Sequence, residues 1–65
     1  MKVTVNGLSH EVTAATLGEL LVELDYEDDW LATAVNAGVV HAAERGDCRL
    51  SEGDRIEILS PMQGG

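Results

Sequence analysis

Polar and hydrophobic residues alternate near the start of the chain, with one interruption. Residues 2–5 are KVTV and residues 8–13 are LSHEVT, and a period of two predicts strands that each bury one face. Asn6 and Gly7 stand between them, and both tolerate the positive φ of a type I′ turn. The pattern therefore predicts a β-hairpin whose second strand turns three side chains to the apolar side: Leu8, His10 and Val12. We expect His10 to be a half-buried residue at the sheet edge.

The period then changes to that of a helix. Four leucines recur at i, i+3, i+4 and i+7, which places them on one helical face: Leu17, Leu20, Leu21 and Leu24. Thr16 and Glu19 match a capping box, in which Thr16 accepts from an early amide and Glu19 reaches back to the helix start. Gly18 lowers helix propensity by about 1 kcal/mol relative to Ala, which suggests that the helix approaches the sheet closely there. The leucine face is expected to pack on the sheet as core.

The rest of the sequence predicts three further strands. Turn residues cluster at 36–38 and at 51–54. A loop is expected at 25–30, with Tyr26 and Trp30 at the core edge; an interface anchor is the alternative role for Trp30. Two strands follow within 31–40, and an irregular stretch with one helical turn lies within 41–54. The last strand is expected at 55–59, with Ile56 and Ile58 inward.

This order of elements, β-β-α-β-β-β, predicts an α+β fold. A helix that joins two strands of one sheet is a crossover, and it must cover the apolar face of that sheet. We therefore predict a β-grasp (ubiquitin-like) architecture, with a mixed four- to five-stranded sheet and one helix packed on one face. The predicted domain spans 1–60, and a flexible tail occupies 61–65.

Length and composition narrow the class of protein. A chain of 65 residues forms one domain and buries only about 60% of its unfolded surface, which leaves no room for a deep catalytic cleft with a lid. The sequence has no run of about 18 apolar residues and no signal peptide. We expect a cytoplasmic protein that does not enter a membrane.

Charge and the scarcity of reactive side chains exclude further classes. Twelve acidic and four basic residues give a net charge of −8, which disfavours nucleic acid as a partner. The charge indicates either a partner with a basic surface or only a solvated acidic surface that keeps the protein in solution. A lone Cys48 cannot form an intrachain disulfide or a thiolate cage, and the acidic run at 25–29 lacks the glycine and distal glutamate of a calcium loop. No metal site is expected. The sequence assigns no role to Cys48, His10 or His41, so an enzyme acting alone is disfavoured.

The last five residues, PMQGG, suggest a C-terminal tail that takes part in a reaction. Pro61 cannot extend the ladder of the preceding strand, and Met62 and Gln63 offer adaptable contacts. Gly64 and Gly65 carry no side chains, so such an end can thread into a narrow enzyme slot. A carboxylate at Gly65 would be a poor electrophile until ATP converts it into an acyl-adenylate, which reacts readily with a sulfur or nitrogen nucleophile.

With these features the sequence resembles the ThiS family of sulfur carriers of thiamine biosynthesis. The resemblance covers nearly the whole chain and rests on VNG, TLGELL, AVN followed by VV, EGDRIEIL and PMQGG. It implies that Gly65 is adenylated by a ThiF-like enzyme that uses ATP, receives sulfur from a donor protein as a thiocarboxylate, and passes it to a ThiG-like thiazole synthase. Pro61, Met62, Gln63 and Gly64 would thread into these partners, and no cofactor would be bound. His41 and Ala42 stand where the family often has Pro and Arg, which puts the local loop in question.

Two alternatives stay open at this point. The small subunit of molybdopterin synthase shares the β-grasp fold and the Gly-Gly end, but it is usually longer and richer in aromatic residues. The second alternative is a β-grasp module that regulates or binds another molecule and does not carry sulfur. The net charge and the Gly-Gly end argue against this alternative. The sequence identifies neither the sulfur donor nor the oligomeric state.

Overall fold

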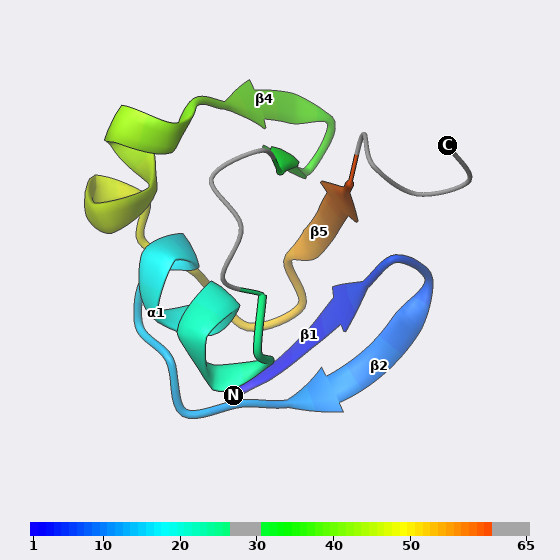
Figure 1. Ribbon diagram of the computed structural model, residues 1–65. Helices are drawn as coiled ribbons and strands as arrows, with labels where there is room; N and C mark the ends of the chain where they lie inside the picture. Colours follow the sequence, from blue (N-terminus) through cyan, green and yellow to red (C-terminus); the bar gives the residue numbers. More distant parts are fainter. Residues whose placement is uncertain (27–30, 61–65) are drawn as a thin grey trace.

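The structure, a computed structural model, describes residues 1–26 and 31–60. Its sheet has five strands in the order β2-β1-β5-β3-β4. One α-helix and one 3₁₀-helix lie together beside it (Figure 1). The elements are β1 (Lys2–Val5), β2 (Leu8–Glu11), α1 (Leu17–Glu23), β3 (Ala32–Val35), β4 (Gly38–Val40), η1 (Ala42–Asp47) and β5 (Arg55–Leu59). The predicted α+β architecture, a β-grasp with one α-helix on one face, is confirmed.

The direction of the strands makes the sheet mixed. β1 pairs with β2 antiparallel and with β5 parallel, while β3 pairs antiparallel with both β4 and β5. A parallel pair cannot be joined by a tight turn, and the chain between β1 and β5 includes both helices and the other three strands. β5 consequently becomes the central strand.

The apolar core lies between α1 and the sheet. Leu17 and Leu20 are fully buried and Leu21 nearly so, while Leu24 is partly buried against them. The sheet contributes the residues expected from the alternation in its strands: Val3, Val5, Ile56 and Ile58. The predicted packing of the leucine face is confirmed, and Tyr26 also packs at the core edge. Trp30 lies outside the described residues.

Both hairpins turn through two residues with positive φ. Asn6 and Gly7 have φ of 50° and 85°, so the type I′ turn predicted there is confirmed. In the second hairpin Val35 pairs with Gly38, and the turn predicted at 36–38 therefore consists of Asn36 and Ala37. Their φ values are 50° and 71°. The left-handed conformation falls on the alanine rather than on the glycine beside it.

The ends of α1 are held by local hydrogen bonds. Thr16 Oγ1 accepts from Glu19 N at 3.2 Å, as predicted. The Glu19 carboxylate accepts from Ala15 N at 2.8 Å, one residue earlier than the capping box requires. At the other end Asp25 has a φ of 66°, and Tyr26 N donates to Leu21 O at 2.7 Å. This closes the helix with a Schellman motif.

Three expectations need correction. Leu8 is 67% exposed, because it lies beside the turn on the edge strand β2; His10 on the same strand is half-buried, as predicted. Segment 41–54 contains the six-residue helix η1 rather than a single turn. A Cβ on Gly18 would lie 3.4 Å from Gly46 Cα, so the close approach at this glycine is to η1 and not to the sheet.

No helix in the described part of the chain is long and apolar enough to cross a membrane.

Candidate functional site

The predicted reactive tail, residues 61–65, follows β5 after Ser60. Pro61, Met62, Gln63, Gly64 and Gly65, and with them the predicted flexible tail, lie outside the described residues. The structure describes the base from which this segment starts, namely β5 and Ser60. The base is central in the sheet, because β5 lies between β1 and β3.

The two faces of β5 differ as the sequence predicts. Ile56 and Ile58 are buried under α1, whereas Arg55, Glu57 and Leu59 alternate on the opposite face and are exposed. Leu59, the last residue of the strand, is 66% exposed. A large aliphatic side chain therefore lies on the open face of the sheet, two residues before Pro61.

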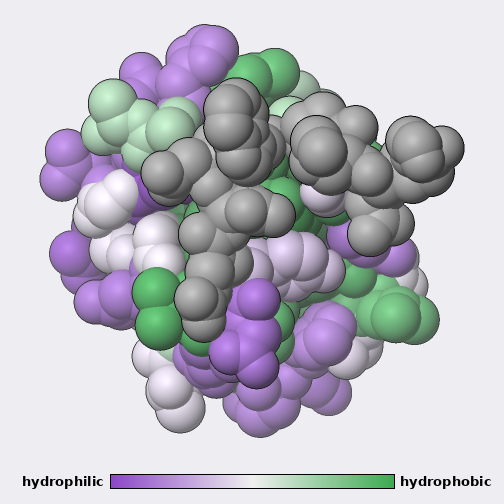
Figure 2. Space-filling model, viewed as in Figure 1, coloured by the Kyte–Doolittle hydropathy of each residue, from purple (hydrophilic) through white to green (hydrophobic). Residues whose placement is uncertain are grey.

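Neighbouring strands extend the apolar area around Leu59. Ala32 pairs with Leu59, and Ala34 pairs with Val39, so these four residues share the open face. We call them the open-face patch. Together with Thr33 and Glu57 they line a shallow hollow of about 140 Å³. Figure 2 shows a small group of hydrophobic atoms at the top of the molecule, where β4 lies in Figure 1.

Two asparagine side chains bond to β5 from its two sides. Asn6 Nδ2 donates to Ile58 O at 3.0 Å, and Ile58 N donates to Asn6 Oδ1 at 2.8 Å. On the other side, Arg55 N donates to Asn36 Oδ1 at 3.0 Å, and Asn36 Nδ2 donates to Asp54 Oδ1 at 3.0 Å. The sequence predicts both residues as turn formers only, and the structure adds these side-chain bonds.

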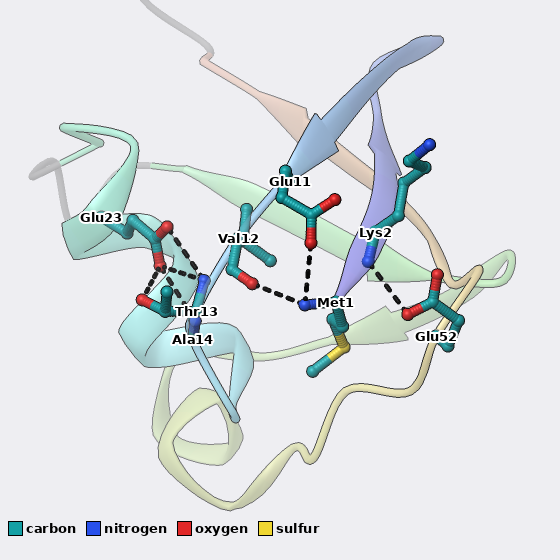
Figure 3. Close-up of polar contacts among 8 residues, drawn as sticks. All are labelled: Met1, Lys2, Glu11, Val12, Thr13, Ala14, Glu23 and Glu52. Atoms are coloured by element: carbon teal, nitrogen blue, oxygen red, sulfur yellow. Dashed lines mark hydrogen bonds and ion pairs between the residues drawn. The ribbon is translucent and has the colours of Figure 1, made fainter.

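Several acidic side chains bond to the main chain of the domain itself. The Glu23 carboxylate accepts from Thr13 N at 3.1 Å and from Ala14 N at 2.9 Å (Figure 3). Glu52 accepts from Lys2 N at 3.1 Å. These carboxylates remain exposed, yet part of the acidic surplus that suggested a basic partner also holds loops in place.

A buried arginine supports the start of β3. Arg45 of η1 is 8% exposed and Thr33 is 3% exposed. Arg45 Nε donates to Thr33 Oγ1 at 3.0 Å, its Nη2 donates to Leu31 O, and Thr33 Oγ1 donates to Val40 O at 2.6 Å. This network links η1 to the hairpin that carries Val39. The sequence analysis did not single out Arg45, because no signal in the sequence distinguishes it from Arg49 or Arg55.

The remaining reactive side chains stay apart. Cys48 is half-buried at the end of η1, where its carbonyl accepts from Leu17 N at 2.8 Å. His41 precedes η1, and its main-chain N donates to Glu44 Oε1 at 3.2 Å; the loop questioned at this position is thus an ordered helix start. His10 lies on β2. Within 1–26 and 31–60, no hydrogen bond joins Cys48 to either histidine.

Comparison with known proteins agrees with this geometry. The model of the ThiS family matches residues 3–65. The chain belongs to the ThiS family. Members of the ThiS family are sulfur carriers rather than enzymes, which fits a small domain in which the likeness extends through the Gly-Gly end.

Two solved structures are similar over the whole chain. A crystal structure of a thiamine biosynthesis protein (ThiS) from Geobacter metallireducens has a TM-score of 0.83 and 29% sequence identity, with all of both chains covered. An NMR structure of a thiamine biosynthesis protein from the same organism has a TM-score of 0.80 and 29% identity, with 100% of this chain and 88% of that chain covered. No curated protein was found to match.

Proposed function

We propose that this protein carries sulfur for thiazole formation in thiamine biosynthesis as a thiocarboxylate on Gly65. The observation that carries the proposal is the family match, which includes the tail and ends on Gly65. The similar crystal structure is that of a thiamine biosynthesis protein, and the fold supports the proposal because the tail follows the central strand of the sheet. The protein is then a co-substrate of its partner enzymes.

The proposed chemistry has two steps. A ThiF-like enzyme uses ATP to convert the Gly65 carboxylate into an acyl-adenylate, with release of pyrophosphate. A persulfide on a donor protein then attacks the acyl carbon, and AMP leaves. A second thiol reduces the resulting acyl disulfide and forms a disulfide with the donor sulfur, so that the thiocarboxylate is released with sulfur in place of one oxygen. A ThiG-like thiazole synthase is the acceptor of this sulfur. The chain itself needs no bound cofactor for either step.

The open-face patch supplies a docking surface for these partners. Leu59 and Val39 are 66% and 71% exposed, and residues at the centre of protein interfaces are commonly large apolar side chains in desolvated contacts. Because only Ser60 separates Leu59 from the tail segment, a partner that covers the patch can also receive the tail. The net charge of −8 favours encounter with a basic surface.

Intact-protein mass spectrometry tests the proposed function. The protein is incubated with ATP, magnesium, a ThiF-like enzyme and a sulfur donor. We expect an oxygen-to-sulfur mass shift that requires ATP and maps to Gly65. Deletion of Gly65 should abolish the shift, because the carboxylate on Gly64 would fall one residue short of the nucleotide.

Two further variants separate the tail from the rest of the chain. One residue added after Gly65 turns the reactive carbonyl into a peptide bond and should also abolish the shift. Cys48→Ser should leave it intact, because Cys48 lies at the end of η1 and its main-chain carbonyl, which the substitution keeps, makes the bond to Leu17. A shift that survives deletion of Gly65, or one that disappears in Cys48→Ser, contradicts the proposal.

A further inference from the structure

The two hairpin turns of the sheet use the same chemistry on opposite ends of β5. Asn6 and Asn36 each hold the first position of a type I′ turn with a φ of 50°. Each main-chain N–H donates to a β5 carbonyl, Asn6 to Ile56 at 2.9 Å and Asn36 to Arg55 at 2.7 Å. The side-chain amide of Asn6 also bonds to Ile58, and that of Asn36 bonds to Arg55 and Asp54.

The direction of the strands decides which end each amide reaches. β1 runs parallel to β5, so a residue that follows β1 lies beside the C-terminal half of β5. β3 runs antiparallel to β5, so a residue that follows β3 lies beside its N-terminal end. Asn6 therefore bonds to Ile58, close to the tail, whereas Asn36 bonds to Arg55 and Asp54, far from it.

Asn6 takes the place of strand residues that β1 does not provide. The register of β1 with β5 ends at the pair Val5 and Ile56. Beyond this pair, the Asn6 carboxamide offers one donor and one acceptor, and Ile58 uses both, through its main-chain N–H and C=O. The Asn6 side chain thus continues the hydrogen-bond ladder on the β1 side of β5 as far as Ile58.

We propose that Asn6 is a positioning residue that fixes the direction in which the tail leaves the sheet. This inference rests on the proposed function, in which the tail delivers Gly65 to a partner. Without the Asn6 amide, the end of β5 keeps its β3 partner but loses both bonds on its other side. The fraction of molecules with the tail base in its docking orientation then falls, and apparent affinity falls by the same fraction.

Asn6→Gly and Asn36→Gly form a matched pair for the test. Glycine tolerates positive φ, so each variant keeps its turn and loses only the side-chain bonds to β5. Hydrogen exchange in the isolated protein reads out the local effect. In Asn6→Gly, the Ile58 amide should exchange about two- to tenfold faster relative to Leu20, the range for one net hydrogen bond. In Asn36→Gly, the Arg55 amide should exchange faster instead, and the exchange rate of the Ile58 amide should be unchanged.

The consequence for the tail is measured with the adenylating enzyme. In Asn6→Gly, the KM for the carrier should rise by up to about tenfold with kcat unchanged, because only the binding-competent fraction is altered. Asn36→Gly should leave KM at its wild-type value. A general loss of stability would instead raise the exchange rate of the Leu20 amide in both variants. It would not raise KM in Asn6→Gly alone.

Unchanged Ile58 exchange in Asn6→Gly, or equal KM values in the two variants, overturns the inference. If Asn6→Gly does not fold, Asn6→Asp replaces it, since Asp also tolerates positive φ and loses the donor to Ile58 O; KM should again rise while Asn36→Gly does not change it. If the wild-type protein is not adenylated at all, the proposed function fails, while the exchange comparison still decides whether Asn6 holds the end of β5.

Discussion

The two faces of the sheet differ in how far they expose the side chains of the same strand. On the face covered by α1, Ile56 and Ile58 of β5 are 1% and 4% exposed. On the open face, Leu59 of the same strand is 66% exposed. Both faces present aliphatic side chains, so composition alone does not separate core from docking surface. The covering element separates them: α1 supplies the apolar partner on one face, and within residues 1–26 and 31–60 Leu59 on the other face stays exposed.

The largest expected effect is on the covered face. Leu21→Ala should lower the free energy of unfolding by about 2–5 kcal/mol, the range for truncation of a buried leucine. The neighbouring Val22 is 73% exposed on the same helix, and Val22→Ala is the control, with an expected change within about 0.5 kcal/mol. Urea denaturation measures both. Similar losses in the two variants would remove the distinction between buried and exposed positions of α1.

The open face should respond in binding rather than in stability. Leu59→Ala should change the free energy of unfolding by no more than about 0.5 kcal/mol. It should weaken binding to the adenylating enzyme about tenfold, because burial of a leucine side chain contributes about 1.5–3 kcal/mol when complete. Isothermal titration calorimetry measures the affinity. Val22→Ala serves again as the control, since Val22 is similarly exposed but lies on the helix; weakening by both variants would argue against the open-face patch as the docking surface.

Charge should influence encounter more than the docked complex. The association rate with the adenylating enzyme should fall as salt rises, because exposed charges are screened over about 8–10 Å at physiological ionic strength. The dissociation rate should change less, since the apolar contacts of the open-face patch are not screened. Stopped-flow measurements over a salt series resolve the two rates. A salt-independent association rate would exclude electrostatic steering by the net charge of −8.

The smallest effect concerns a turn outside both faces. Ala37 holds a φ of 71°, a conformation that costs a non-glycine residue about 1–2 kcal/mol. Ala37→Gly should raise the free energy of unfolding by about 0.5–1 kcal/mol, after the larger backbone entropy of glycine in the unfolded chain is subtracted. Gly7→Ala is the reverse control, since a Cβ there meets nothing within 4 Å and only its φ of 85° opposes it. Thermal denaturation should show opposite signs; equal signs would contradict strain at Ala37.

The features that the sequence predicts well are those set by local pattern. The strand alternation, the leucine spacing and the Asn6-Gly7 turn depend on residues close in the chain, and each is confirmed. The prediction for Leu8 was wrong because its exposure depends on where the edge strand lies relative to α1, which alternation does not encode. The buried position of Arg45 was missed for the same reason: Thr33 and Leu31 lie more than ten positions away in sequence. For the site, the Gly-Gly motif suggested the chemistry, whereas the Asn6 bonds to Ile58 join residues 52 apart.

The parallel pairing of β1 with β5 also determines how the protein must fold. Thr4 meets Arg55 in this pair, which closes a loop of about 50 residues before any of its stabilising contacts can form. Such non-local pairing slows folding compared with local helix or hairpin formation. β5 can therefore take its central place only after distant parts of the chain have come together. Under the proposed function, a partly folded chain offers no ordered base for its tail, so sulfur loading selects molecules that have completed folding.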